Sequence, residues 1–294
     1  MSMSKKDKFT DFSQTPSAGF PAASTLTALP HASSPTSLRS ASASRLPETA
    51  SPGSPPSRHP ESQNPSLASS ASRHPDPAGR IKAVLFDYDG TVGDTNQLVI
   101  DSWQHTFMTI RGRRTDDELL YHTFGEPLRE TMARFFPEHD LEDALRIYRD
   151  WQAAQDQNRW YLFPGMRQLI GELRRRGYRM GIVTSRTRDS LERALVYLGM
   201  EDTFSAIVTC DDTTVHKPEP EPALIGLEKL DVRPDQALFV GDTHYDMGCA
   251  HNAGIEAVLV GWSRSMRPED KVGIYRPDYE IKNAGELLEI LEKC

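Results

Sequence analysis

Short apolar runs alternate with longer amphipathic segments over the second part of the chain. The apolar runs have the length and the uninterrupted hydrophobic character of buried strands, and they lie at 82–86, 178–184, 205–208, 237–240, 257–260 and 279–281. The segments between them show helical spacing, and they lie after Pro164-Gly165 as far as Arg176 and at 188–198, 222–230, 245–252 and 284–292. Strands that alternate with helices predict an α/β fold with a Rossmann-like parallel sheet covered by helices on both faces.

A stretch without any strand pattern separates the first apolar run from the second. Helices are predicted there at 116–121, 128–136 and 141–155, after a first helix that can place Leu98, Ser102, His105 and Met108–Thr109 on one face. We therefore predict a small helical insert at 95–161, placed after the first strand. The α/β core then comprises 80–94 and 162–294.

The first 79 residues differ in composition from the rest of the chain. They contain 19 Ser, 12 Pro and 11 Ala, and their few apolar residues show no period. Such a segment buries too little apolar surface to offset the entropy of ordering it, so we predict that 1–79 are a disordered tail. Its Ser-Pro steps permit a role as a modified interaction segment, and a plain extension of the chain explains them equally well.

The charge and the cysteine content of the chain indicate which kinds of partner and which cellular compartment to expect. Residues 80–294 carry 27 Lys+Arg against 37 Asp+Glu, and this acidic balance argues against nucleic acid as a partner. The cysteines Cys210, Cys249 and Cys294 match no zinc or disulfide spacing, and no apolar run reaches the ~20 residues needed to span a membrane. We predict a cytoplasmic protein. A transit peptide is the alternative, although the Ser-rich tail lacks an Arg-lined amphipathic helix.

Polar residues that suit phosphate and metal chemistry fall at or beyond the ends of four predicted strands. In chain order they are Asp87-Tyr88-Asp89-Gly90-Thr91, Thr184-Ser185, His216-Lys217-Pro218 and Gly241-Asp242-Thr243-His244-Tyr245-Asp246. Ligands of parallel sheets bind at the carboxyl ends of the strands, so we expect these groups to form one site.

The acidic residues of this set predict a cation site. Asp87 and Asp89 point the same way if the chain stays extended, and Asp242 and Asp246 can face one site if a helix starts between them. Like charges this close are costly unless a cation or a proton lies between them, and carboxylate oxygens suit Mg²⁺. Lys217 stands before a proline in a stiff segment, which suits a cation held at one spot.

These four motifs, in this order, resemble those of the haloacid dehalogenase superfamily of phosphatases, and the resemblance covers essentially all of 81–294. It implies that Asp87 is the nucleophile that forms an aspartyl-phosphate and that Asp89 is the general acid and then the general base. It also implies that Thr184 and Lys217 hold the transferred phosphoryl oxygens. The implied Mg²⁺ ligands are Asp87, the backbone carbonyl of Asp89, and Asp242, with Asp246 acting through a water or behind the ligands.

Within the superfamily, the insert looks like the small helical cap of the phosphoglycolate phosphatase subfamily. Asp94-Thr95-Asn96-Gln97-Leu98 is most similar to bacterial pyrophosphatases and phosphoglycolate phosphatases, whereas Val92 departs from the usual Leu. The segment 123–129 resembles a Gly-x-Pro loop that reaches over the site. Gly125 would permit its turn, Arg129 would meet a second anionic group of the substrate, and the Ser185 hydroxyl would bond a phosphate oxygen.

Several other activities occur on this fold, and the sequence argues against some of them. Dehalogenases lack the second carboxylate of the first motif, which is present here as Asp89, and residues 95–161 contain no Lys for the Schiff base of a phosphonate hydrolase. A phosphomutase would share every catalytic residue and stays open, as does a non-catalytic interaction protein. We expect a small phosphorylated metabolite as substrate, and the motifs leave its leaving group and the oligomeric state open.

Overall fold

Parallel strands form a six-stranded central sheet in the order β3-β2-β1-β4-β5-β6. The computed structural model describes residues 79–155 and 159–294. The strands are β1 (Ala83–Phe86), β2 (Arg179–Val183), β3 (Ala206–Val208), β4 (Ala237–Gly241), β5 (Glu256–Val260) and β6 (Tyr279–Ile281). Every pairing between neighbours is parallel, and the predicted α/β class is confirmed.

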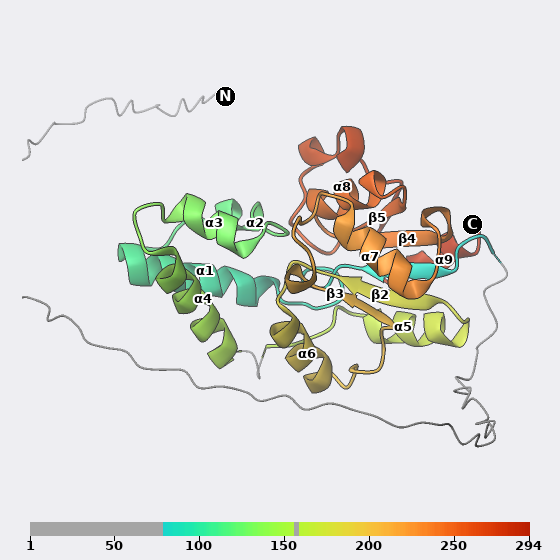
Figure 1. The fold of residues 1–294 in the computed structure, drawn as a ribbon, viewed down its shortest axis with the longest axis horizontal. Helices are drawn as coiled ribbons and strands as arrows, with labels where there is room; N and C mark the ends of the chain where they lie inside the picture. Colours follow the sequence, from blue (N-terminus) through green and yellow to red (C-terminus); the bar gives the residue numbers. More distant parts are fainter. Residues whose placement is uncertain (1–78, 156–158) are drawn as a thin grey trace, which may run out of the picture. The chain divides into compact units, whose positions relative to one another are not determined.

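Helices cover both faces of this sheet (Figure 1). They are α5 (Met166–Arg175), α6 (Arg188–Tyr197), α7 (Glu221–Leu230), α8 (His244–Asn252) and α9 (Glu286–Leu291). Val84 and Phe86 of β1 share a core with α5, α6 and α9, whereas Ala83 and Leu85 share the other core with α7 and α8. Successive strand residues point to opposite faces, so one uninterrupted apolar run supplies both cores.

Between β1 and α5 the chain forms a group of helices with a core of its own, which we call the helical insert. It comprises α1 (Asn96–Arg111), α2 (Asp117–Tyr121), α3 (Leu128–Phe135) and α4 (Leu141–Gln155). Trp103 of α1 packs edge-on against Phe135 and Tyr148, with ring centroids 5.4 and 5.1 Å apart. These aromatic contacts join α1 to α3 and α4.

The buried face of α1 differs in part from the predicted one. Leu98 and Ser102 are buried, but Met108 is 51% exposed. Trp103 and Phe107 are buried instead, because their large rings fill the centre of the insert. The face of a helix is therefore set here by its largest side chains.

Short 3₁₀ helices complete the described elements, at η2 (Cys210–Asp212), η3 (Pro234–Gln236), η4 (Pro268–Asp270) and η5 (Gly273–Tyr275). Over 79–155 and 159–294, no helix combines the length and the apolar character that a membrane span requires. The predicted disordered tail lies, except for Gly79, outside the described residues. The division into a core at 80–94 and 162–294 and a cap at 95–161 stays a prediction.

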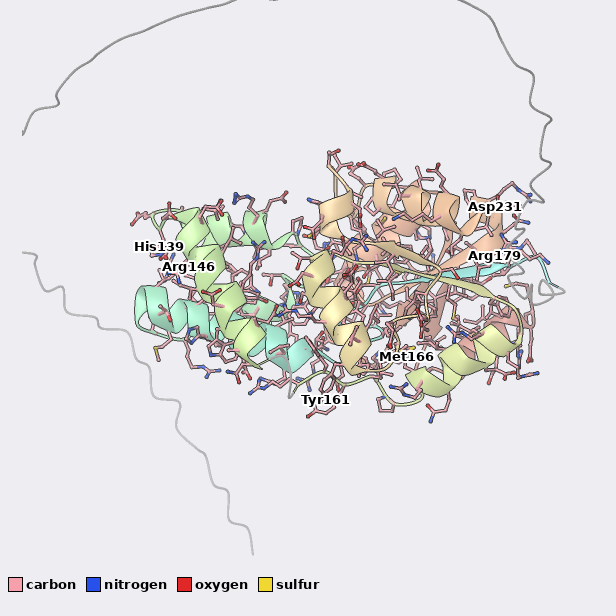
Figure 2. The ribbon with its side chains drawn as sticks, turned by 60° about the horizontal axis from the view of Figure 1, so that its bottom comes forward. His139, Arg146, Tyr161, Met166, Arg179 and Asp231 are labelled. Carbon is pink, nitrogen blue, oxygen red and sulfur yellow. The ribbon has the colours of Figure 1, made fainter. Side chains whose placement is uncertain are left out.

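The carboxyl ends of the strands point toward the helical insert. Figure 2 shows Arg179, at the start of β2, beside Asp231 at the end of the sheet away from the insert, whereas His139 and Arg146 lie in the insert. The polar loops that follow β1, β2 and β4 therefore lie at the edge where the core meets the insert.

Candidate active site

Strand register brings the predicted polar residues to one level of the sheet. Phe86 pairs with Ile182 of β2 and with Val240 of β4. Asp87, one residue further on, therefore lies level with Val183 and Gly241, the last residues of the strands on either side of β1, and Thr184 and Asp242 follow directly. The backbone N–H of Asp87 donates to the Val240 carbonyl at 2.9 Å, which fixes the start of the loop.

A tight turn after Asp87 lets two loops approach closely. Gly90 has φ +80°, and a Cβ atom at this position would lie 2.3 Å from an Asp242 carboxylate oxygen. Any side chain at residue 90 would therefore displace Asp242, in addition to the strain of the left-handed backbone. Glycine is required here by both geometry and conformation.

Lys217 is the centre of the buried charge cluster. Its side chain is 2% exposed, and its ammonium donates to Asp87 Oδ1 at 2.8 Å, to Asp246 Oδ1 at 2.7 Å and to the Val183 carbonyl at 3.4 Å. The ammonium uses its three donors on three acceptors. The structure thus brings together the cation and the acids that the sequence placed beyond different strands.

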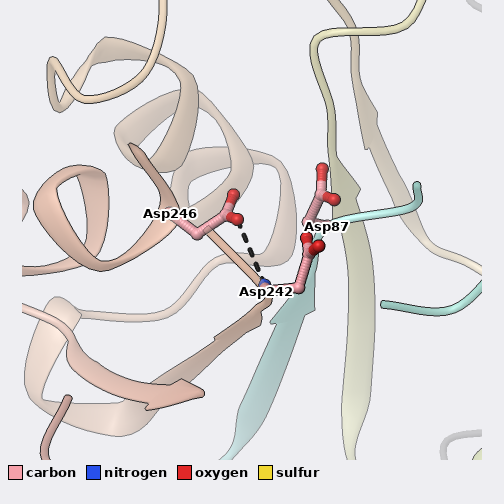
Figure 3. A group of neighbouring side chains, drawn as sticks. All are labelled: Asp87, Asp242 and Asp246. Carbon is pink, nitrogen blue, oxygen red and sulfur yellow. Dashed lines mark hydrogen bonds between the residues drawn. The ribbon is translucent and has the colours of Figure 1, made fainter. Parts of the chain in front are cut away.

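Asp246 positions both Lys217 and the first turn of α8. Its Oδ2 atom accepts from the backbone N–H groups of Asp242 and Thr243, at 3.2 and 3.0 Å, and from the Thr243 hydroxyl at 2.6 Å. Figure 3 shows the Asp246 carboxylate turned toward the Asp242 backbone nitrogen. Because its other oxygen holds Lys217, this carboxylate ties the helix N-terminus to the cation.

Two hydroxyl groups that were not predicted hold Asp242. Ser263 and Ser265 both donate to Asp242 Oδ2 at 2.6 Å, and the Thr91 hydroxyl lies 3.4 Å from Oδ1. Both serines follow β5 in the segment Gly261–Ser265, so the rule that ligand-binding groups lie beyond strand ends could have found them. They fix the direction in which Asp242 presents its second oxygen.

The cluster carries more negative charge than Lys217 can balance. Burial, together with the charge of Asp246, raises the pKa of Asp242 to about 7. Burial also raises the pKa of Asp87 well above its usual range, although the Lys217 ammonium acts against this shift. The pKa of Lys217 is raised too, because its two carboxylate partners outweigh the cost of burying it. The cluster is thus short of positive charge.

A divalent cation fits this cluster. Asp87, Asp242 and Asp246 are buried, and one carboxylate oxygen from each lies within 4.8 Å of the others (Figure 3). Oxygen atoms are the ligands that hard divalent ions prefer, and such an ion would supply the missing positive charge. The three acids therefore form a candidate metal site.

Asp89 is held by Arg186, a residue that the sequence motifs did not predict. Arg186 donates through Nε to Asp89 Oδ2 at 3.0 Å and through Nη2 to Oδ1 at 2.7 Å, and the Thr95 hydroxyl donates to Oδ1 at 2.6 Å. Burial alone would raise the pKa of Asp89, but the Arg186 charge and these bonds hold it below its usual value. No spacing rule pairs an arginine beyond β2 with a carboxylate beyond β1, because only the sheet register brings them together.

The remaining predicted residues lie at the boundary between core and insert or on the surface. Thr184 is 5% exposed at the end of β2, and the Ser185 hydroxyl donates to the Gly125 carbonyl at 3.0 Å. The structure therefore brings Ser185 and Gly125 together. Arg129 lies elsewhere, with a side chain that is 55% exposed and bonded to Glu142 of the insert. Its predicted contact with a second anionic group stays a prediction.

A pocket of about 330 Å³ opens beside Lys217 and is bordered by both the insert and the core. Its lining includes Glu126 and Arg134 from the insert and His216 and Tyr245 from the core. The Tyr245 hydroxyl donates to Glu126 at 3.0 Å, so the pocket wall is itself a contact between core and insert. Lys217 is the member of the buried cluster that lines this pocket.

A parallel sheet of this order, with a buried aspartate directly after β1 and a lysine and further acids beyond later strands, is the architecture of a Rossmann-like α/β protein with a polar site at the carboxyl ends of its strands. Residues 84–260 match the haloacid dehalogenase-like hydrolase family, and this range includes all four motifs. The chain belongs to this family. The resemblance seen in the motifs and the prediction of an enzyme of the phosphatase type are confirmed.

Relatives over the same region have names that refer to phosphate hydrolysis. The chain is 36% identical over 215 residues to a protein of Caldanaerobacter subterraneus named "Putative pyrophosphatase PpaX", covering 73% of this chain and 96% of that protein. It is 34% identical over 212 residues to the pyrophosphatase PpaX of Bacillus cereus, covering 72% and 97%. A crystal structure from Lactobacillus plantarum, titled a "putative phosphoglycolate phosphatase", superposes with a TM-score of 0.63 at 26% identity, covering 71% and 99%.

Proposed function

We propose that this protein is a Mg²⁺-dependent phosphohydrolase that transfers the phosphoryl group of a small phosphorylated metabolite to Asp87. The main support for this proposal is the environment of Asp87. Its carboxylate is buried, Lys217 fixes one of its oxygens at 2.8 Å, and Asp242 lies close beside it. A nucleophile held in one orientation beside neutralising charge is what phosphoryl transfer requires.

The reaction proceeds in two displacements. In the first, an Asp87 oxygen attacks phosphorus, the bond from phosphorus to the leaving oxygen breaks, and Asp89 gives that oxygen a proton. Asp89 has to carry this proton in the substrate complex, although Arg186 lowers the pKa of Asp89 and so favours its charged form in the free protein. In the second, Asp89 takes a proton from a water molecule, the water oxygen attacks the phosphorus of the aspartyl-phosphate, and the Asp87 carboxylate is released with inorganic phosphate. Thr184 and Lys217 hold the phosphoryl oxygens in both displacements.

Asp87, Asp242 and the backbone carbonyl of Asp89 would hold the metal, with Asp246 placed behind them. When bound, Mg²⁺ supplies positive charge that offsets the charge of the phosphoryl group and of the carboxylates. Asp246 keeps Lys217 in place and caps α8 through bonds that use both of its oxygens. Ser263 and Ser265 fix one Asp242 oxygen and leave the other available as a ligand.

The substrate we favour is inorganic pyrophosphate, with 2-phosphoglycolate as the second candidate. The first follows from relatives at 34–36% identity that are named pyrophosphatases, the second from a structure at 26% identity. Both substrates are small enough for a site covered by the helical insert, which we propose acts as the cap. The contacts from Ser185 to Gly125 and from Tyr245 to Glu126 place the insert against the core beside the acidic cluster.

The test is phosphate release from a panel that contains pyrophosphate, 2-phosphoglycolate, a sugar phosphate and a nucleoside monophosphate, with Mg²⁺. Asp87→Asn is the blank, because it removes the nucleophilic oxygen with little change of shape. Turnover of one substrate far above the rest, absent in the variant, supports the proposal. Conversion of a sugar phosphate to an isomer without phosphate release would favour a phosphomutase. Binding without any turnover would favour a non-catalytic protein.

A further inference from the structure

Arg186 is a buried cation to which the two displacements assign no role. Its side chain is 5% exposed, and its guanidinium binds both oxygens of Asp89 while Nη1 donates to the Ser190 hydroxyl at 2.7 Å. The planar fork of arginine matches the two oxygens of a carboxylate or of a phosphate. The guanidinium can therefore bind an anionic group of a substrate as it now binds Asp89.

The position of Arg186 places it beside the leaving group. Its backbone N–H donates to Thr184 Oγ1 at 3.2 Å, next to where the transferred phosphoryl group is to be held. Its guanidinium binds Asp89, the residue assigned to protonate the leaving oxygen. A substrate that reaches both Thr184 and Asp89 thus brings its leaving portion to the guanidinium.

Hydrogen bonding around Asp89 shows what has to change when a substrate binds. Oδ1 accepts from Arg186 Nη2 and from Thr95, and Oδ2 accepts from Arg186 Nε. Both oxygens of Asp89 thus accept from the guanidinium, so a proton that Asp89 passes to a leaving oxygen comes from an atom that is bonded to Arg186. A buried guanidinium that loses a carboxylate partner without replacement is strongly destabilised, whereas a leaving group with its own carboxylate or phosphate oxygens provides that replacement.

We propose that Arg186 selects substrates whose leaving group is itself anionic, by exchanging bonds to Asp89 for bonds to that anion. This inference rests on the proposed function and makes its substrate class specific. Pyrophosphate and 2-phosphoglycolate share the required property, because phosphate and glycolate both leave with a negative charge. Monoesters of neutral alcohols lack it and leave Arg186 bound to Asp89.

The test compares 2-phosphoglycolate with 2-hydroxyethyl phosphate, which replaces the carboxylate by a neutral hydroxymethyl group of similar size. For the native enzyme we expect kcat/KM to favour 2-phosphoglycolate by about 10²-fold or more. Arg186→Gln reduces this preference to within about fivefold, mainly by lowering kcat/KM for the anionic substrate. Arg186→Lys, which keeps the charge but loses the fork, gives an intermediate preference.

The control is Arg188→Gln, which removes an arginine two residues further on that pairs with Asp212 at the surface and leaves the preference unchanged. Equal losses on both substrates in Arg186→Gln would overturn the inference and show that Arg186 only positions Asp89. A native enzyme without the preference would overturn it as well. If Arg186→Gln does not fold, the inference is tested by comparing the preference for 2-phosphoglycolate over 2-hydroxyethyl phosphate in the native enzyme and in Arg186→Lys. Failure of the native enzyme on every phosphate ester and on pyrophosphate would instead reject the proposed function itself.

Discussion

At the scale of single residues, the buried cluster is defined by its charge. Asp87 and Asp246 pair with one ammonium group and Asp242 lies beside them, so the buried cluster keeps an excess of negative charge. Buried charges are tolerated only when they are paired, bonded or bound to a metal. Protons and divalent cations should therefore compete for the same oxygens.

A proton and Mg²⁺ are expected to compete for Asp242, so the effect of Mg²⁺ on stability should depend on pH. The pKa of Asp242 is about 7 in the folded protein, against an ordinary value of 3.8. Between these values the folded protein keeps a proton that the unfolded chain has lost, so the stability of the metal-free protein falls as pH rises through this window. Bound Mg²⁺ replaces the proton. We therefore expect the increase in Tm from EDTA to Mg²⁺ to be small at pH 5.5 and to reach several degrees at pH 8.

Thermal unfolding monitored by fluorescence measures this difference. Asp242→Asn serves as the control, because it removes both the titration and the metal ligand, and its Tm should respond little to Mg²⁺ at either pH. A native protein whose Mg²⁺-induced shift is the same at pH 5.5 and pH 8 would contradict the assignment of the metal to these carboxylates.

The negative charge of Asp246 is expected to contribute to catalysis because it holds Lys217 in place. Asp246→Asn keeps the shape of the side chain but removes one of the two negative charges that hold Lys217. We expect kcat/KM to fall about 10²-fold, because a positioned charge in a buried site contributes several kcal/mol to transition-state stabilisation. Steady-state kinetics measure the loss. Asp278→Asn is the matched control, since Asp278 also binds a backbone N–H but lies outside the cluster. Equal activity of the Asp246 variant and the control would count against this role.

Single residues differ in how far the sequence predicts their roles. Asp87, Asp242 and Lys217 follow buried strands within motifs of fixed spacing, and the structure brings them together as expected. The predicted contacts of Arg129 depend on its rotamer and on a bound substrate, and here it pairs with Glu142. The bond from Arg186 to Asp89 joins residues 97 positions apart, so it becomes visible only once the sheet is assembled.

At the scale of elements, the loop between α2 and α3 connects the insert to the core. The Gly125 carbonyl accepts from Ser185, and Glu126 accepts from Tyr245. Gly125 has φ +86°, and a Cβ atom there would lie 2.8 Å from Thr243 Oγ1 and 2.9 Å from a ring carbon of Tyr245. A side chain at residue 125 would therefore collide with the start of α8.

Gly125 and Gly112 both have a positive φ, so their alanine variants can be compared. Gly125→Ala and Gly112→Ala each place a Cβ on a residue with positive φ, at a cost of about 1–2 kcal/mol. The Gly112 position has open space around it, whereas the Gly125 position crowds the core. We expect Gly125→Ala to lower kcat/KM at least ~10-fold because the loop must move away from α8, and Gly112→Ala to keep kcat/KM within about twofold.

Kinetic constants together with Tm for both variants separate the two effects. Similar losses of Tm with a loss of activity only in Gly125→Ala would support a functional contact between insert and core. Full activity in Gly125→Ala would show that this loop plays no part in turnover.

Elements were predictable where the pattern was strong and local. The strands and helices of the core follow from apolar runs and helical spacing, and their bounds move by only a few residues in the structure. The buried face of α1 was predicted less well, because both of its sides carry residues of mixed polarity and the packing of Trp103 and Phe107 decides between them. Tertiary packing thus overrides local pattern where that pattern is ambiguous.

At the scale of the whole molecule, every residue that takes part in the two proposed displacements lies within 84–260, the range that matches the hydrolase family. We therefore predict that a truncated chain starting at Gly79 keeps kcat/KM within about twofold of the full chain. The reason is that the two sheet cores and the core of the insert are built from residues 81–291. Parallel assays of the full and truncated chains test this, and a large loss of turnover on truncation would assign residues 1–78 a part in catalysis.

The transfer of a phosphoryl group to Asp87 can be observed directly. Pyrophosphate labelled with ³²P is mixed with the enzyme and Mg²⁺, the reaction is stopped in acid during turnover, and the label is located by peptide mapping. We predict label on the peptide that contains Asp87, none without Mg²⁺ and none in Asp87→Asn, with 2-phosphoglycolate labelled on phosphorus as the substrate if pyrophosphate is not turned over. Steady turnover without label on this peptide, together with an active Asp87→Asn variant, would contradict the assignment of Asp87 as the nucleophile.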